Sequence, residues 1–183
     1  HCERLEIEFA VQEQPRGTAD AVVAAEVFAG DDAFAIVNSD NYYPVEALAG
    51  LRAMEGPGLA AFARDSMLSQ GNITAERLLK FAVVEAGEDG FLRQVIEKPE
   101  AEMLQGLKGP LGVGMNCWRF DARIFEACRA IKVSARGEFE LPDAVQYAID
   151  HLGVRFAVRI FAAAVLDLSD QGDVQAVAQR LQD

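Results

Sequence analysis

Cysteine and histidine are scarce in this sequence of 183 residues, which contains three cysteines and two histidines. Cys2, Cys117 and Cys128 are odd in number and show no Cys-x-x-Cys spacing, so neither a disulfide framework nor a Cys/His zinc site is indicated. This pattern is typical of reduced thiols. We therefore expect a cytoplasmic protein.

Basic residues and long apolar runs are also in short supply. Only 17 Lys and Arg face 29 Asp and Glu, and the net charge is −12. Phosphate backbones and anionic membranes are bound by Lys/Arg patches, so we expect neither nucleic acid nor a membrane surface as a partner. No apolar run reaches the roughly 18 residues of a membrane span. The nearest, over 154–168, is interrupted by Arg155, Arg159 and Asp167.

The remaining composition is that of an ordinary globular protein, with 51% hydrophobic and 25% charged residues. The length suits one domain with a sizeable core. No internal repeat, low-complexity tract or linker divides the sequence. We therefore predict a single domain over residues 1–183, and the sequence leaves a homo-oligomer open.

Apolar runs and turn signals predict alternating strands and helices. The runs typical of strands span 3–11, 33–38, 59–63, 79–85, 91–97, 111–120, 155–160 and 164–168. The segments typical of helices span 18–28, 44–54, 101–107, 122–130, 142–152 and 170–181. Residues 86–90 have the composition of a hairpin turn, and 64–77 are predicted to be a loop. The order predicts an α/β fold whose mixed, mostly parallel sheet has helices on both faces.

The string QEQPRGTADA, Gln12 to Ala21, places a glycine and amide side chains in a loop that leads into a helix. The Gln12 amide has a donor and an acceptor that match a pyrimidine edge, and Gly17 lets the backbone approach a base. Thr18 is a weaker candidate for nucleotide binding. The alternative is an ordinary turn at the start of a helix, with Thr18 as its capping residue.

The apolar run Phe34–Val37 continues into Asn38-Ser39-Asp40-Asn41, so a short buried strand ends on a carboxylate. Open α/β sheets bind ligands at the carboxyl ends of their strands. A carboxylate there suits Mg²⁺ held together with nucleotide phosphates. Asp40 is therefore a candidate catalytic metal ligand, and its alternative role is to cap the helix that begins at Pro44.

Taken in order, these motifs resemble the sugar-1-phosphate nucleotidyltransferases, which make nucleoside-diphosphate sugars. The resemblance continues through Phe81-Ala82-Val83-Val84-Glu85, Val95-Ile96-Glu97-Lys98-Pro99, Gly137-Glu138-Phe139-Glu140 and Val165-Leu166-Asp167-Leu168. It implies the Rossmann-like fold of nucleotide-diphospho-sugar transferases. It also implies a nucleoside triphosphate and a sugar 1-phosphate as substrates, with Mg²⁺ as cofactor.

The resemblance also implies roles for individual residues. Asp167 would be the second ligand of the Mg²⁺ bound by Asp40. Glu97 would accept hydrogen bonds from sugar hydroxyls, and Lys98 would hold the sugar phosphate. Ala82 stands where the family usually has glycine.

Two further positions belong to the expected sugar pocket. In Gly114-Met115-Asn116-Cys117-Trp118 the usual Asn-x-Gly of the family appears as Gly-x-Asn. This places Asn116 at the pocket, and Trp118 either lines it or belongs to the core. Because Ala82 and Asn116 both depart from the family pattern, the identity of the sugar does not follow from the resemblance.

The family also has a strand, a Gly-x-Gly-Thr-Arg loop and a lysine upstream of the position of Gln12. The sequence begins at His1 without them. We interpret it as a nucleotidyltransferase domain lacking its first strand and phosphate-binding loop, and expect weak activity or none from the chain alone. Two alternatives stay open: a non-catalytic nucleotide-sugar-binding or regulatory protein, and a metal-dependent glycosyltransferase. For the base, Gln12 predicts that UTP or dTTP is preferred over CTP.

Overall fold

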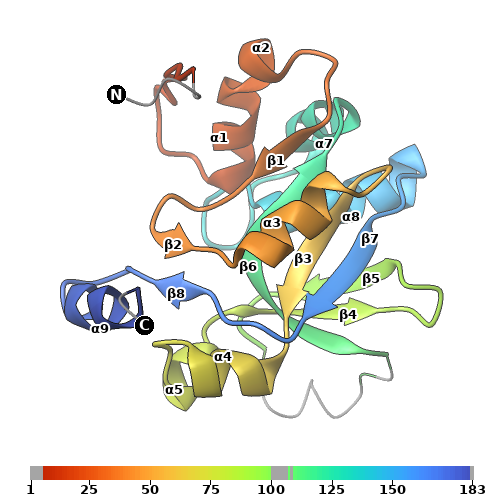
Figure 1. Ribbon diagram of the computed structural model, residues 1–183. Coiled ribbons are helices and arrows are strands. Elements are labelled where there is room, and N and C mark those ends of the chain that lie inside the picture. The colour runs from red at the N-terminus through yellow and green to blue at the C-terminus, as the bar shows by residue number, and fades with distance from the viewer. Residues whose placement is uncertain (1–5, 100–106, 108, 182–183) are drawn as a thin grey trace. The chain divides into compact units, whose positions relative to one another are not determined.

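The computed structural model describes residues 6–99, 107 and 109–181 (Figure 1). They form two compact units: unit one comprises the described residues of 6–34 and 121–154, and unit two comprises those of 35–120 and 155–181. That the whole chain is one domain stays a prediction. Cys2 and all but the last residue of the helix expected over 101–107 lie outside the described residues.

A six-stranded sheet forms the centre of unit two, with the strand order β5-β4-β6-β3-β7 and with β1 paired to β6. Its strands are β1 (Phe34–Ile36), β3 (Gly58–Phe62), β4 (Ala82–Ala86), β5 (Leu92–Ile96), β6 (Leu111–Phe120) and β7 (Ala157–Phe161). Every residue of β3 is buried, as its uninterrupted apolar sequence requires. The predicted mixed α/β sheet is confirmed.

The expected majority of parallel neighbours is wrong for the strand pairs whose direction is resolved. β3 and β7 are parallel, whereas β3–β6, β4–β5 and β4–β6 are antiparallel. Two features explain the difference. β4 and β5 are joined by the predicted hairpin, which forces them to be antiparallel. The ten-residue strand β6 then lies between β3 and β4 and runs against both.

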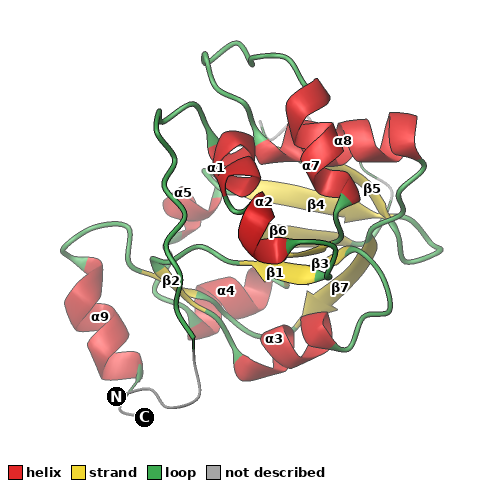
Figure 2. Ribbon diagram, turned by 90° about the horizontal axis from the view of Figure 1, so that it is seen from above, coloured by secondary structure: helices red, strands yellow, loops and turns green. Residues whose placement is uncertain are grey.

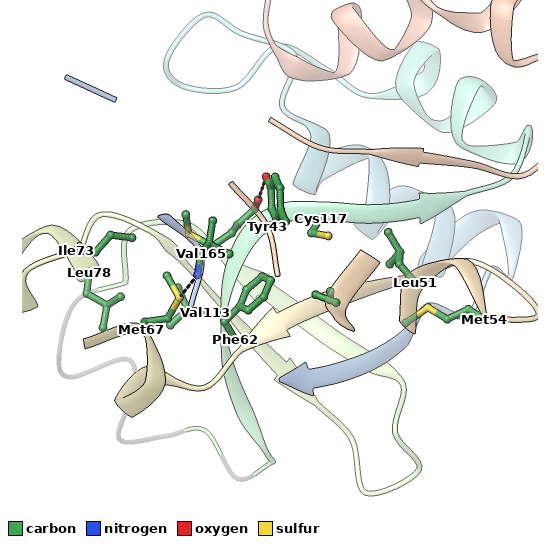
Figure 3. Packing of buried hydrophobic residues seen from close by; sticks show 13 residues of the cluster. Tyr43, Leu51, Met54, Phe62, Met67, Ile73, Leu78, Val113, Cys117 and Val165 are labelled. Carbon is green, nitrogen blue, oxygen red and sulfur yellow. Dashed lines mark hydrogen bonds between the residues drawn. The ribbon is translucent and has the colours of Figure 1, made fainter. Parts of the chain in front are cut away.

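The core of unit two lies where α3 (Val45–Arg52) packs on β3 and β6. The helix begins directly after Pro44, as predicted. Figure 3 shows this packing: Leu51, Phe62 and Val113 are almost completely buried, and Tyr43 lies in the same cluster. Shape and hydrophobic burial therefore hold α3 against the sheet.

Residues 64–77, predicted to be a loop, contain the helix α4 (Arg64–Gln70) and all but the last residue of α5 (Ala75–Leu78). α4 is anchored by Met67, whose side chain is fully buried, and α5 is capped by the Thr74 hydroxyl, which accepts from the amide of Arg77 at 3.3 Å. Helices this short carry too few apolar residues to show a period in the sequence.

A separate two-stranded sheet of unit two joins β2 (Asn41–Tyr42) to β8 (Leu166–Asp167). Figure 1 shows the two short strands side by side, with α9 (Asp173–Arg180) following β8. Asn41 faces Asp167 in the antiparallel register. This sheet therefore places the end of the Asp40 motif beside the Asp167 motif.

Unit one is built from helices, namely α1 (Thr18–Ala24), α2 (Glu26–Ala29), α7 (Arg123–Ala130) and α8 (Leu141–Leu152). α7 packs on α8 and on α1, and Figure 2 shows α7 and α8 side by side. Phe34 stacks on Phe125 with ring centroids 5.3 Å apart. The single helix expected over 18–28 is divided at Ala25.

Residues 6–12, all within the described part of the chain, form no strand, which corrects the strand expected over 3–11. Their alternating Ile7, Phe9 and Val11 are 68%, 92% and 77% exposed. Alternation alone does not make a strand, because the backbone groups also need a pairing partner. None of the described helices is long and apolar enough to cross a bilayer.

Candidate active site

Three neighbouring strands of unit two carry the residues expected at the sugar-phosphate site. Val83 on β4 faces Ile96 on β5, so the register brings Glu97 level with Ala82. Ala82 in turn faces Gly114 on β6, two residues before Asn116. Residues predicted from three separate motifs therefore follow one another across β5, β4 and β6.

Lys98 and Asn116 share an unusual backbone conformation. Their φ values are 45° and 51°, and they are the two non-glycine residues with positive φ in the described part of the chain. Such a conformation costs about 1–3 kcal/mol and tends to occur at functional sites. At Lys98 the following residue is Pro99, which further disfavours helical backbone conformations. The observation supports the placement of both residues in a binding site.

A β-bulge explains the conformation of Asn116. Along β3 and β6, Ala60 faces Cys117 and Ala61 faces Gly114, so Met115 and Asn116 are left opposite no β3 residue. Asn116 is half-buried there. Asparagine is one of the few residues besides glycine that adopts the left-handed region readily.

Asp40 and Asp167 lie close together on neighbouring backbone segments. The Leu168 amide donates to the Asp40 carbonyl at 2.8 Å, and Asn41, which follows Asp40, pairs with Asp167. Asp40 is exposed, whereas Asp167 is only 2% exposed. The structure thus brings together two backbone segments that carry acidic residues far apart in the sequence.

The buried Asp167 carboxylate is held by several donors. Its Oδ1 accepts from Asn41 Nδ2 at 3.1 Å and from the Ser169 hydroxyl at 2.6 Å, and its Oδ2 forms an ion pair with Arg77. Asn72 adds two hydrogen bonds to the Asp167 backbone. These contacts hold Asp167 in one orientation.

Arg77 is shared between two acids. Its Nη1 lies 2.6 Å from Asp173 Oδ1 and its Nη2 lies 3.0 Å from Asp173 Oδ2, in addition to the contact with Asp167. The hydrogen bond from Arg77 lowers the pKa of Asp173. The hydrogen bond to Asp173 and the charges of Asp173, Asp167 and Asp170 raise the pKa of Arg77, so one cation faces three carboxylates.

The donor set at Asp40 and Asp167 fits Mg²⁺. Two carboxylates are a usual protein contribution, and water and phosphate oxygens supply the remaining ligands of this ion. Asp167 already accepts three of the roughly four hydrogen bonds that a carboxylate takes, so at most one position on it is left for a cation. Among the described residues, no group of three or more His, Cys, Asp or Glu is placed to hold a metal.

The candidate base-binding residue Gln12 lies in unit one. Its Nε2 donates to the Gly17 carbonyl at 3.1 Å and to Asp20 Oδ2 at 2.8 Å. Both amide hydrogens are therefore used within the segment that runs from Gln12 to Asp20. The contact expected from the sequence, in which both the donor and the acceptor of the Gln12 amide meet a base, is therefore not available in this arrangement. Gln12, Arg16 and Asp20 line a hollow of about 340 Å³.

Gly17 and Thr18 attach the same loop to the segment before α8. At Gly17 φ is 118°, and a Cβ there would lie 2.4 Å from the Phe139 carbonyl oxygen. The Thr18 hydroxyl accepts from the Leu141 amide at 2.9 Å, at the first turn of α8. Glycine is therefore required for a close backbone approach, and the Thr18 hydroxyl serves as a cap.

Sequence reasoning missed some of these residues, and one candidate for the sugar pocket, Trp118, belongs to the core. Arg77 lies in the segment that was predicted to be a loop, and no motif marks Asp20 or Tyr43. Trp118 is 3% exposed and stacks on Phe120, so it belongs to the core. An arginine that pairs with distant acids leaves no local signal in the sequence.

The predicted residues thus fall into two groups. Unit two holds Asp40 and Asp167 together with Ala82, Glu97, Lys98 and Asn116, and unit one holds Gln12, Gly17 and Thr18. The family described as "Nucleotidyl transferase" matches this sequence over residues 2–175. The chain belongs to this nucleotidyl transferase family.

Individual relatives agree with the family. A glucose-1-phosphate thymidylyltransferase of Mycobacterium tuberculosis is 30% identical over 162 residues, which cover 86% of this chain and 50% of the relative. An enzyme of the same name from Streptomyces antibioticus is 31% identical over 147 residues, covering 80% of this chain and 38% of its own. The chain spans half of the first relative and less of the second. The resemblance to sugar-1-phosphate nucleotidyltransferases is confirmed.

Solved structures share the fold of this chain. A UDP-glucose pyrophosphorylase complexed with UDP-glucose has a TM-score of 0.67 at 18% identity, over 92% of this chain and 64% of its own. A putative glucose-1-phosphate thymidylyltransferase from Bacillus anthracis has a TM-score of 0.62 at 20% identity, over 93% of this chain and 63% of its own. At these identities the likeness concerns the fold alone.

Proposed function

We propose that the protein containing this chain transfers a nucleotidyl group from a nucleoside triphosphate to a sugar 1-phosphate. A phosphate oxygen of the sugar 1-phosphate attacks the α-phosphorus, and pyrophosphate leaves with the electron pair of the broken bond. The reaction needs positioning and charge neutralisation more than side-chain chemistry. The observation that carries the proposal is the pairing of β2 with β8, in which Asn41 lies opposite Asp167 and the Asp40 carbonyl accepts from the Leu168 amide.

In this proposal Asp40 and Asp167 hold Mg²⁺, which neutralises phosphate charge when it is bound. Lys98 holds the sugar phosphate, and Glu97 accepts hydrogen bonds from sugar hydroxyls. Ala82 and Asn116 shape the sugar pocket. The register across β5, β4 and β6 supports these roles.

For the nucleotide, Gln12 Oε1 accepts a hydrogen bond from the base, and Gly17 allows the close approach of the loop. Uracil and thymine carry a hydrogen on N3 and cytosine does not, so we propose UTP or dTTP. The names of the relatives, thymidylyltransferase and UDP-glucose pyrophosphorylase, are consistent with this choice.

We place the reaction in the cytoplasm. Cys117 and Cys128 are buried free thiols, and burial raises their pKa values to about 11 and about 12. Thiols of this kind are unreactive and suit a reducing compartment. That the protein avoids nucleic acid and membranes stays a prediction, and so does a homo-oligomeric state.

Pyrophosphate release by the full-length protein tests the function. The assay pairs each of dTTP, UTP, CTP, ATP and GTP with glucose 1-phosphate, and we expect turnover to be fastest with dTTP or UTP. The 183-residue chain alone should be much slower, because its relatives are about twice as long or longer. Binding of the nucleotide sugar without pyrophosphate release would favour the non-catalytic alternative.

Asp40→Asn tests the metal site in the same assay. It removes a ligand charge but little volume, and loss of about 3 kcal/mol of transition-state stabilisation lowers kcat roughly 100-fold. Asp65→Asn is the matched control, since its side chain is 98% exposed on α4 of the same unit. Equal kcat values for the two variants at saturating Mg²⁺ would show that Asp40 does not bind the metal and has a role only in the turn before the helix that begins after Pro44.

A further inference from the structure

Tyr43 is a buried phenol that joins the Asp40 segment to the bulge in β6. Its Oη accepts from the Asn38 amide at 3.0 Å and donates to the Met115 carbonyl at 2.6 Å. The residue is only 6% exposed and belongs to the core cluster shown in Figure 3, where a dashed line marks its contact with the Met115 carbonyl. The hydroxyl thus bridges two segments separated by 72 positions in the sequence.

The hydrogen bond from Tyr43 to Met115 meets β6 at the bulge, where two residues of β6 have no partner on β3. Met115 and Asn116 are the residues left over by the register shift, and Asn116 has a φ of 51°. Asparagine tolerates this region better than most residues, but the conformation still needs support from the surrounding structure. The Tyr43 hydroxyl donates to the carbonyl of the peptide unit that joins Met115 to Asn116, and this hydrogen bond supports the conformation.

The same hydroxyl is linked to the candidate metal ligands. Asn41 donates from Nδ2 to Asp167 Oδ1 at 3.1 Å, and its Oδ1 lies 3.3 Å from Tyr43 Oη. Burial raises the pKa of Tyr43, so the phenol keeps its single proton, and the shorter contact assigns that proton to Met115. Asn41 therefore lies between Asp167 and Tyr43, while the one hydrogen bond that the phenol donates runs to the bulge.

We propose that Tyr43 is a positioning residue that fixes the Met115–Asn116 bulge and thereby sets Asn116 for contact with the sugar of the sugar 1-phosphate. The inference rests on the proposed function, because it takes the sugar site to lie across β4 and β6. It adds that the sugar site depends on a hydroxyl in the core. Tyr43 itself touches neither substrate.

Steady-state kinetics of the full-length protein with dTTP and glucose 1-phosphate test the inference. Tyr43→Phe removes the hydroxyl alone and should raise the KM for glucose 1-phosphate about tenfold, while the KM for dTTP stays within about twofold. Tyr42→Phe, at a neighbouring residue that is 49% exposed, is the matched control and should change neither constant.

A double-mutant cycle separates positioning from a general loss of stability. Glycine adopts positive φ without strain, so Asn116→Gly makes the bulge less dependent on Tyr43. In that background Tyr43→Phe should change the KM for glucose 1-phosphate less than about threefold, which is a non-additive result. Equal effects of Tyr43→Phe in both backgrounds would overturn the inference.

The remaining outcomes are also decisive. A wild-type protein that releases no pyrophosphate with any nucleotide and sugar phosphate refutes the proposed function, and this inference with it. An active wild type whose KM for glucose 1-phosphate is unchanged by Tyr43→Phe overturns this inference alone. If Tyr43→Phe does not fold, Asn116→Ala tests the same bulge, and an unchanged KM for glucose 1-phosphate overturns the inference.

Discussion

The Arg77 ion pairs provide the sharpest stability test of unit two. Asp167 is 2% and Asp173 is 6% exposed, and both are held by the Arg77 guanidinium. Arg77→Met removes the cation and leaves two buried carboxylates without their main partner. Removing one member of a buried ion pair costs about 3–5 kcal/mol.

Two observations favour the lower end of that range. A quarter of the Arg77 side chain is exposed, so solvent screens part of the interaction. Asp167 also keeps its donors from Asn41 and Ser169. We therefore expect a loss of about 3 kcal/mol in the free energy of unfolding, which is roughly a 100-fold change in the equilibrium constant.

Urea denaturation of the chain measures this loss through its single tryptophan, Trp118, which is buried in unit two with Arg77. Arg64→Met is the matched control, because Arg64 meets Asp65 at 4.0 Å on the exposed surface. Arg64→Met should lower the free energy of unfolding by less than about 1 kcal/mol. Equal midpoints for the two arginine variants would refute the assignment of a stabilising ion-pair cluster.

Two further predictions concern unit one. Gly17→Ala should destabilise it by about 2–4 kcal/mol in thermal unfolding followed by circular dichroism, because the new Cβ meets the Phe139 carbonyl at a positive φ. Gly153→Ala, with positive φ but open space around it, should cost only about 1–2 kcal/mol, and equal losses would contradict the clash. The hydrogen bond from Gln12 lowers the pKa of Asp20. The stability that this contact contributes is therefore present above the ordinary carboxyl pKa and is lost as pH falls through the lowered pKa. The side-chain amide signals of Gln12 in NMR spectra should accordingly move only below about pH 3.9, and a midpoint above that value would contradict the contact.

Sequence reasoning succeeded where the signal is local. The hairpin of β4 and β5 follows from two apolar runs around a polar turn, and the start of α3 follows from the proline before it. The family resemblance also depended only on short motifs in order. Such features are set by residues that are neighbours in the sequence, so they can be predicted from the sequence alone.

Sequence reasoning failed where a strand or helix depends on a partner. Residues 6–12 alternate as a strand does, yet pairing decides whether a strand forms. The direction of β6 depended on which strands it joins, and the short helix α4 depended on the burial of Met67. These outcomes are properties of contacts that the local pattern does not encode.

The candidate site divides in the same way. The sequence by itself determined the residue types and their order, because carboxylates, amides and glycines at strand ends and loops suit a nucleotide and a metal whatever the details of packing. Only the tertiary structure decided which of them meet. Arg77 and Asp167 are 90 positions apart, and Tyr43 and Met115 are 72 apart. Strand register and core packing bring such pairs within hydrogen-bonding distance, and neither can be derived from one segment alone.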